Sequence, residues 1–185
     1  MAVLFISEDY LKSSSAISKN VDVEELLPHI KVAQDIDIHG KLGTDLYNHL
    51  QSGVSGNSLS AAETTLIDEY IAPALVHWAL YQAMPFLGFK IMNKSIVQKS
   101  SENAAAAGTE DIKYLREIVR NTAEHYTDRL VQYLEHAQSD HPEYNTNTGA
   151  DLDPSREAFY SGMNLATVRY KRGLTLEDFL DNGLI

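Results

Sequence analysis

Apolar residues recur every three or four positions along two long stretches of the chain, and each pattern predicts a helix with a buried face. The first stretch is 60–89, where Ser60 and Glu63 form a predicted capping box at the start of the helix. Beyond Ile71 its apolar residues go nearly all round the helix, so other elements or a neighbouring subunit must cover it. The second stretch is 109–138. We expect the two helices to pack antiparallel.

A membrane span is the competing interpretation of the first stretch, because 71–89 has about the ~20 residues that a bilayer requires. His77, Gln82 and two prolines lie within it, and no basic cluster sets an orientation. We therefore interpret it as a core helix. Pro73 is expected to kink or break this helix, because proline has no N–H and clashes with the preceding turn. Pro85 is expected to end it.

Shorter patterns fill the chain around these two helices. The predicted elements are a turn and a helix that begins near Pro28 and ends at Gly40 to Gly43, a helix at 45–51, a Gly/Ser-rich connection at 52–59, and a β-hairpin near 88–100. An isolated hairpin is marginally stable, so this one is expected to lean on the helices or to pair with another subunit.

The predicted fold is mainly α: a helical bundle with a small β-hairpin and an extended C-terminal arm. Residues 1–20 are expected to form an extended N-terminal arm, 21–138 the bundle, and 139–185 an extension that contacts partners. Deleting 139–185 should then leave the helices folded and abolish assembly. The expected partner-binding residues are the apolar and basic side chains of this extension: Phe159, Tyr160, Met163, Arg169, Tyr170, Lys171, Arg172 and Phe179.

Composition narrows the possible functions. A chain of 185 residues with 44% hydrophobic residues can bury one core. It has no Cys, which excludes disulfides, thiolate metal sites and a Cys nucleophile. The net charge of −11 disfavours binding to phosphates, and the one dense basic patch, at 169–172, is expected to pair with an acidic protein surface. The N-terminus is not expected to be a signal peptide, because it lacks a basic region and a long apolar run.

No sequence motif of a nucleotide-binding loop, metalloprotease or serine hydrolase is present in the chain. The best metal candidate is the trio Asp35, Asp37 and His39, which converges only on extended backbone, because residues two apart on a helix face different ways. His125 is a candidate general base and is interpreted as a surface residue. His77 is interpreted as a hydrogen-bonded core residue.

The remaining histidine candidates lie near the end of the second long helix: His136 and His141, with Glu135 beside them. A cation there is compatible with the helix dipole. We predict neither catalytic residues nor a bound metal or cofactor. The alternative that stays open is a small acidic helical metal-binding protein or enzyme that uses the Asp35–His39 trio or His125. A regulatory protein with the same bundle is a third possibility.

A set of positions between residues 5 and 138 carries a resemblance to a known family. These positions are Ile17 to Asp22, Leu27 to Ile30, Ala33 to Asp35, Leu42 to Thr44 with Leu46 and Tyr47, Ile71 with Pro73 to Leu75, Lys99 to Asn103, and Tyr114 to Arg116. With them the chain resembles the head–tail connector (adaptor or ring) proteins of tailed bacteriophages, most closely those of crAss-like phages. The resemblance does not extend with the same strength beyond Ser139.

The resemblance implies a structural virion protein without catalytic residues or cofactor. Such subunits assemble, typically twelvefold, into a ring below the portal that extends the DNA channel and docks the tail. The implied partners are further copies of the chain, the portal protein and other connector or tail proteins, with no membrane. The implied location is the head–tail junction, after assembly in the host cytoplasm. DNA would pass through the channel without specific binding, and this would explain the acidic net charge of the chain.

Overall fold

The computed structural model describes residues 3–18, 20–87, 108–149 and 151–155, together with the backbone of 89–92 and 95–98. Its elements are α1 (Glu8–Ser13), α2 (Val23–Ala33), η1 (Gln34–Ile38), α3 (His39–Leu42), α4 (Thr44–Gly56), α5 (Ala61–Thr65), η2 (Leu66–Ile71), α6 (Ala72–Leu87), β1 (Phe89–Met92), β2 (Ser95–Gln98), α7 (Thr109–His136) and η3 (Pro142–Asn145). The mainly helical class predicted from the sequence is confirmed.

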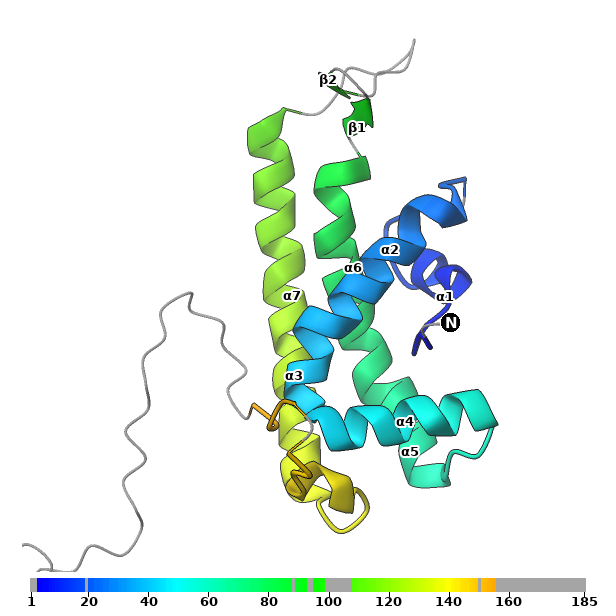
Figure 1. Ribbon diagram of the computed structural model, residues 1–185. Coiled ribbons are helices and arrows are strands. Elements are labelled where there is room, and N and C mark those ends of the chain that lie inside the picture. The colour runs from blue at the N-terminus through cyan, green and yellow to red at the C-terminus, as the bar shows by residue number, and fades with distance from the viewer. Residues whose placement is uncertain are drawn as a thin grey trace, which may run out of the picture.

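Two long helices form the centre of the molecule, as predicted. The segments α5, η2 and α6 run on as one helix, and α7 lies antiparallel beside it, with α2 crossing on the other side of α6 (Figure 1). The capping box is also confirmed. Ser60 Oγ accepts the Glu63 N–H at 3.2 Å, and Glu63 Oε2 accepts the Ser60 N–H at 2.6 Å. No helix among the described residues is both long and apolar enough to cross a bilayer.

The prolines of the central helix do not end it. A π-helical stretch, η2, comes directly before Pro73, and Pro85 lies inside α6. Each proline deprives the carbonyl four residues earlier of its usual helical donor, and these carbonyls belong to Glu69 and Tyr81. The prediction that Pro85 terminates the helix is therefore wrong.

Two arginines of α7 compensate for the missing donors. Arg129 Nη1 donates to the Glu69 carbonyl at 3.3 Å, and Arg116 Nε donates to the Tyr81 carbonyl at 3.2 Å. Each guanidinium also lies over a tyrosine ring of the central helix: Arg116 is 3.9 Å from the centroid of Tyr81, and Arg129 is 4.7 Å from that of Tyr70. The two carbonyls that the prolines leave without a helical donor thus bind side chains of α7.

The first helices differ from the sequence prediction at their ends. Helix α2 begins at Val23, so Pro28 lies inside it and not at its start. The carbonyl that Pro28 leaves without a helical donor belongs to Glu24, in the exposed first turn, where water can satisfy it. Helix α4 continues to Gly56, through part of the stretch predicted as a connection.

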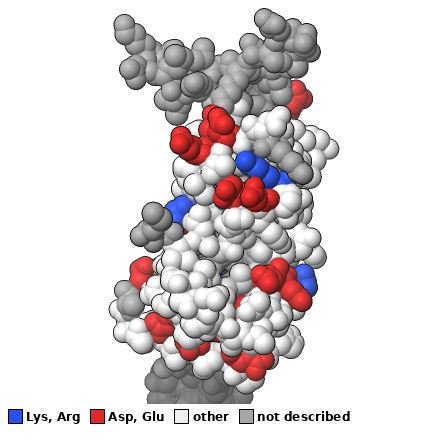
Figure 2. All heavy atoms as spheres, turned by 90° about the vertical axis from the view of Figure 1, so that its right-hand side faces the viewer, with Lys and Arg blue, Asp and Glu red and all other residues white. Residues whose placement is uncertain are grey.

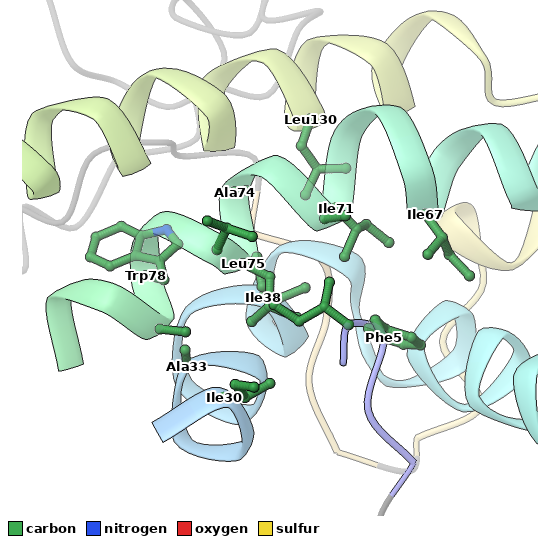
Figure 3. Close-up of a cluster of buried hydrophobic side chains, with 14 of the residues drawn as sticks. Phe5, Ile30, Ala33, Ile38, Ile67, Ile71, Ala74, Leu75, Trp78 and Leu130 are labelled. Carbon is green, nitrogen blue, oxygen red and sulfur yellow. The ribbon is translucent and has the colours of Figure 1, made fainter. Parts of the chain in front are cut away.

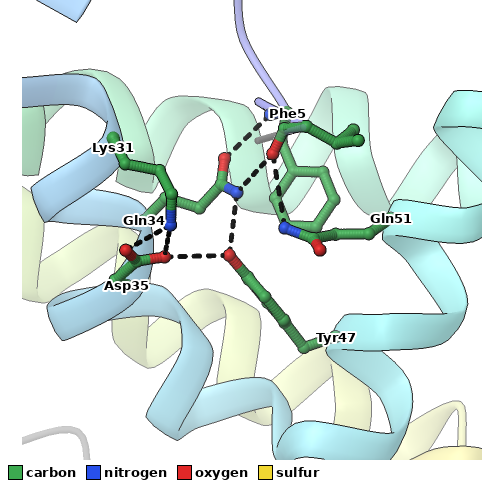
Figure 4. A network of polar contacts seen from close by, with 7 residues as sticks. Phe5, Lys31, Gln34, Asp35, Tyr47 and Gln51 are labelled. Carbon is green, nitrogen blue, oxygen red and sulfur yellow. Dashed lines mark hydrogen bonds and ion pairs between the residues drawn. The ribbon is translucent and has the colours of Figure 1, made fainter. Parts of the chain in front are cut away.

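The N-terminal segment contributes to the core and includes a helix, α1, so the prediction of an extended arm is wrong. Phe5 and Leu11 are buried. The buried side chain of Gln34 holds the segment in place: its Oε1 accepts the Phe5 N–H, and its Nε2 donates to the Val3 carbonyl, both at 2.9 Å (Figure 4). Gln34 also donates to the Tyr47 hydroxyl at 2.9 Å.

The core lies where α2, η1, α4, the central helix and α7 meet (Figure 3). Ile30, Ile38, Ile71, Leu75 and Leu130 are fully buried there. Trp78 joins this core and donates its indole N–H to Thr127 Oγ1 at 2.9 Å, which satisfies the polar atom of the ring. Truncating one of these buried side chains to alanine typically lowers the free energy of unfolding by about 2–5 kcal/mol.

Residues 139–155, assigned from the sequence to the C-terminal extension, pack back onto the helices. Tyr144 is 1% exposed and His141 is fully buried. Leu152 N–H donates to Thr44 Oγ1 at 2.9 Å, and Ser155 N–H donates to the Gly40 carbonyl at 2.8 Å. The packed unit therefore continues to residue 155, past the predicted boundary at 138.

Gly43 makes room for this returning segment. Its φ of 76° lies in the left-handed region, and a Cβ there would come within 2.6 Å of Pro154 Cγ. Any larger residue would therefore be strained and would displace Pro154.

The two strands follow α6. β1 and β2 pair antiparallel, with Phe89 opposite Gln98 and Met92 opposite Ser95. They extend the chain beyond the end of the α6–α7 pair (Figure 1).

Candidate docking site

An apolar groove of about 660 Å³ opens between the N-terminal half of α7, the C-terminal half of α6 and the residues that lead into α2. Its apolar lining comes from three separate parts of the chain: Ile17 and Val21, then Leu80, Met84 and Leu87, then Leu115, Ile118 and Val119. The volume lies within the range of ~300–1,000 Å³ that is typical of ligand pockets. The groove is large enough to take several apolar side chains of a partner.

The apolar side chains on the α7 wall of the groove are unusually exposed to solvent. Leu115 is 49% exposed and Ile118 is 46% exposed, and Tyr114 beside them is 66% exposed. Helix α7 is packed tightly only in its second half, where Leu130 and Leu134 are fully buried. Exposed apolar side chains grouped in this way are typical of interaction sites, so the groove is a candidate docking site.

Carboxylates stand at the α2 end of the groove. Asp22 and Glu25 are exposed and belong to its lining. Figure 2 shows acidic side chains spread over the face of the molecule that carries α1 and the N-terminal end of α2. A partner for this groove is thus expected to combine apolar side chains with positive charge.

A second exposed apolar surface, the α2 stripe, is formed by Val32 and Ile36 with Phe86 of α6. Ile36 is 67% exposed, Phe86 50% and Val32 39%. The Phe86 ring stacks on that of His29 at a centroid distance of 5.1 Å, which extends the stripe along α2. Partial burial lowers the pKa of His29, although Glu25 nearby opposes this effect.

A smaller cavity of about 280 Å³ lies beside Trp78, between η1 and α7. Asp37, Glu124 and Ser155 are among its lining residues. Burial raises the pKa of Asp37 to about 6, and Gln82 Nε2, which donates to Asp37 Oδ2 at 3.2 Å, only partly offsets the cost of desolvation. Asp37 therefore takes up its proton at a higher pH than an ordinary aspartate, in the mildly acidic range.

The structure does not bring the metal candidates Asp35, Asp37 and His39 together. They lie on π- and α-helical backbone, and each has its own partner. Asp35 pairs with Lys31, Asp37 faces Gln82, and His39 Nε2 lies 3.0 Å from Thr44 Oγ1. In the described part of the chain, no group of three or more His, Asp or Glu side chains is arranged to hold a metal ion.

The other histidine candidates also lie apart from one another. His125 is exposed on α7 and contacts Tyr126 edge-on. His77 stacks on Tyr126 with centroids 5.3 Å apart, and burial lowers the pKa of His77. His136 Nδ1 lies 2.7 Å from the Gln132 carbonyl. None of these three contacts pairs a histidine with a nucleophile.

His141 lies fully buried near Tyr133, and its pKa is lowered by burial in spite of the nearby Asp140. Next to this region, His49 Nε2 pairs with Glu63, and His49 Nδ1 lies 3.7 Å from Glu143 Oε1. His49 of α4 thus contacts both the helix-capping Glu63 and Glu143 in the residues after α7.

Sequence reasoning missed the groove, because its walls lie up to about a hundred positions apart in the chain. One local signal existed. Tyr114 and Ile118 are large apolar residues outside the repeat that predicts the buried face of α7, which begins with Ile112, Leu115 and Val119. The eight partner-binding candidates, Phe159, Tyr160, Met163, Arg169, Tyr170, Lys171, Arg172 and Phe179, lie outside the described residues.

Comparison with known proteins identifies a family to which the chain is similar. The family of unknown function DUF6712 matches residues 38–153, from η1 to the segment that packs back on Gly43. No curated protein and no solved structure matches the chain.

Proposed function

We propose a function for this chain, which belongs to the DUF6712 family: it is a structural virion protein, the subunit of a head–tail connector ring of a tailed bacteriophage. In this proposal the ring lies below the portal, extends the DNA channel and docks the tail. Its partners are other copies of the chain, typically twelve in all, the portal protein and neighbouring connector or tail proteins. It works without a cofactor and without a membrane.

The observation that carries the proposal is the presence of two different exposed apolar surfaces on one small subunit. The groove wall at Leu115 and Ile118 belongs to α7. The α2 stripe lies apart from the groove, because its residue Ile36 lines the cavity beside Trp78 instead. A two-fold dimer needs one self-complementary surface, but a closed ring needs two surfaces that fit each other. A subunit with two such surfaces suits a ring.

The charge of the chain supports the passage of DNA in the same proposal. A net charge of −11 and the acidic face of Figure 2 would repel phosphates. A channel that releases DNA quickly gains from walls that do not bind it. A purified ring with a strongly basic inner surface would contradict this part of the proposal.

The assembly state tests the proposal. Light scattering and electron microscopy of the purified chain, alone and mixed with the portal protein of the same phage, should show a closed ring or a portal-bound complex. Ile36→Glu and Ile118→Glu should each abolish it, because each places a charge in one of the two contact surfaces. Asn48→Glu adds the same charge on an exposed part of α4 and should leave assembly intact. A chain that stays monomeric even with the portal would overturn the proposal.

A further inference from the structure

We infer that the groove binds the C-terminal segment, residues 156–185, of a second copy of this chain. The inference rests on the proposed function, because it names the segment that joins neighbouring subunits of the ring. It follows from three observations: the chemistry of the groove, the composition of the segment, and the place where the described chain ends.

The segment has the composition that the groove requires. It offers apolar side chains closely followed by positive ones: Phe159, Tyr160, Met163 and Leu165, then Arg169, Lys171 and Arg172. The groove offers an apolar floor with the carboxylates of Asp22 and Glu25 at one end. The rest of the chain is acidic, so this basic patch is the part of the protein that matches the groove in charge.

The described chain ends on the side of α6 opposite to the groove. Ser155 is held against Gly40 and lines the cavity beside Trp78. The groove is lined instead by Leu80 and Met84. Trp78 and Leu80 are two positions apart, which places them about 200° apart around the helix axis.

The residues of α7 also place Ser155 and the groove on opposite sides of the helices. Thr127 lines the cavity beside Ser155, and Ile118 lines the groove. Nine positions separate them, so they lie about 180° apart around α7. The segment after Ser155 therefore starts on one face of the α2–α6–α7 layer, while the groove opens on the other.

This arrangement favours a second copy as the source of the segment. To enter its own groove, the segment would have to pass round the edge of the layer. In a head-to-tail ring, the face from which the segment leaves lies toward the next subunit, and that subunit can turn its groove toward it.

Cysteine cross-linking of the full chain tests the inference, because the natural chain has no Cys that could interfere. One variant carries Ile118→Cys in the groove wall. Its partner, distinguished by an affinity tag, carries Cys in place of Phe159, Met163, Tyr170 or Phe179. After mixing and mild oxidation, we expect a disulfide-linked pair of the two variants for at least one of the four positions.

The matched control is Glu117→Cys, exposed on α7 and outside the groove lining, which should cross-link at least tenfold less. A single chain that carries both Ile118→Cys and the reactive tail cysteine should link between chains. A link within one chain would overturn the inference, because the segment would then occupy its own groove. The absence of a link at all four positions would overturn it as well.

Charge exchange provides a second readout. Glu25→Lys should reduce the cross-link yield at least threefold, and Arg169→Glu in the partner should restore part of it. Glu24→Lys is the control, because Glu24 lies in the same helical turn but does not line the groove. Equal losses for Glu24→Lys and Glu25→Lys would contradict a role of the groove carboxylates.

The proposed function and this inference can fail separately. If the full chain forms a ring but no tail position cross-links to Ile118→Cys, the subunits join in another way, and only the inference fails. If the chain stays monomeric with and without the portal, the ring itself is absent and the proposed function fails.

Discussion

Asp37 is the residue whose protonation the fold changes most clearly, and its position suggests a measurable effect of pH on stability. It belongs to η1 and faces Gln82 of α6, with Lys41 as a second polar neighbour. The pKa of Asp37 rises from an ordinary 3.8 to about 6, mainly because burial removes water from the carboxylate. Between these two values the folded protein holds more protons than the unfolded chain, so its stability falls as the pH rises from about 4 to about 6.

Asp37→Asn should therefore stabilise the protein at pH 7.5 by on the order of 1–2 kcal/mol, because it removes a charge that is costly to bury. An Asn side chain can still accept the hydrogen bond from Gln82. The gain should shrink as the pH falls through 6 and should nearly vanish at about pH 3, since Asp37 is then largely protonated in both the folded and the unfolded state. Urea unfolding at both pH values measures the difference.

Asp68→Asn is the control for this measurement, because Asp68 is exposed on η2 and its substitution removes the same formal charge. Its effect should stay within about 0.5 kcal/mol at both pH values. If the two substitutions had the same dependence on pH, burial of Asp37 would not be the cause.

At the scale of elements, the attachment of α7 to the two proline carbonyls can be tested by a double-mutant cycle. Arg116→Gln should destabilise the protein by about 1–2 kcal/mol, because the Tyr81 carbonyl loses its donor and the Tyr81 ring loses the guanidinium. Pro85→Ala restores a backbone N–H for that carbonyl. In the Pro85→Ala background, Arg116→Gln should therefore cost less, by about 0.5–1.5 kcal/mol.

Chemical denaturation of the four proteins in the cycle measures this coupling. Lys113→Gln on the same helix is the control, because Lys113 is exposed and its ion pair with Glu110 is exposed as well. A cost of Arg116→Gln that is the same in both backgrounds would show that the arginine acts through the tyrosine ring alone.

The elements that could be predicted from the sequence are those whose signal is local. The buried faces of the long helices and the capping box of Ser60 depend on neighbours within a few positions. Helix α4 was predicted too short because Ser52, Gly53 and Ser55 disfavour a helix interior. In the fold, both serines donate to carbonyls one turn earlier, and Gly53 leaves room for Leu59, whose Cδ2 would lie 2.5 Å from a Cβ.

The groove was not predicted from the sequence, because its parts come together only through the fold. The sequence directed attention to the apolar and basic residues of the C-terminal segment. It did not show that Leu80, Leu115 and Ile17 form one groove, since no local pattern connects them. The return of residues 139–155 was missed for the same reason: the carboxylate of Asp45 binds Thr146 and Thr148, about a hundred positions away.

At the scale of the whole molecule, the packing of residues 139–155 on the helices determines how far the chain can be shortened without loss of stability. A chain that ends after Ser155 keeps the described helices and the returning segment 139–155, and it should unfold at nearly the same temperature as the full chain. A chain that ends after Gln138 loses the buried side chains of Tyr144 and His141 and the hydrogen bond from Leu152 to Thr44. Loss of one buried aromatic side chain alone typically costs about 3–5 kcal/mol.

Thermal unfolding followed by circular dichroism separates the two truncations. The shorter chain should lose several kilocalories per mole of stability or fail to fold, since this is a large part of the ~5–15 kcal/mol that small proteins possess. Tyr144→Ala in the full chain is the control, and it should reproduce much of the loss without any change in length. If the chain that ends after Gln138 were as stable as the one that ends after Ser155, residues 139–155 would belong to the partner-binding extension, and the segment available for assembly would begin at 139.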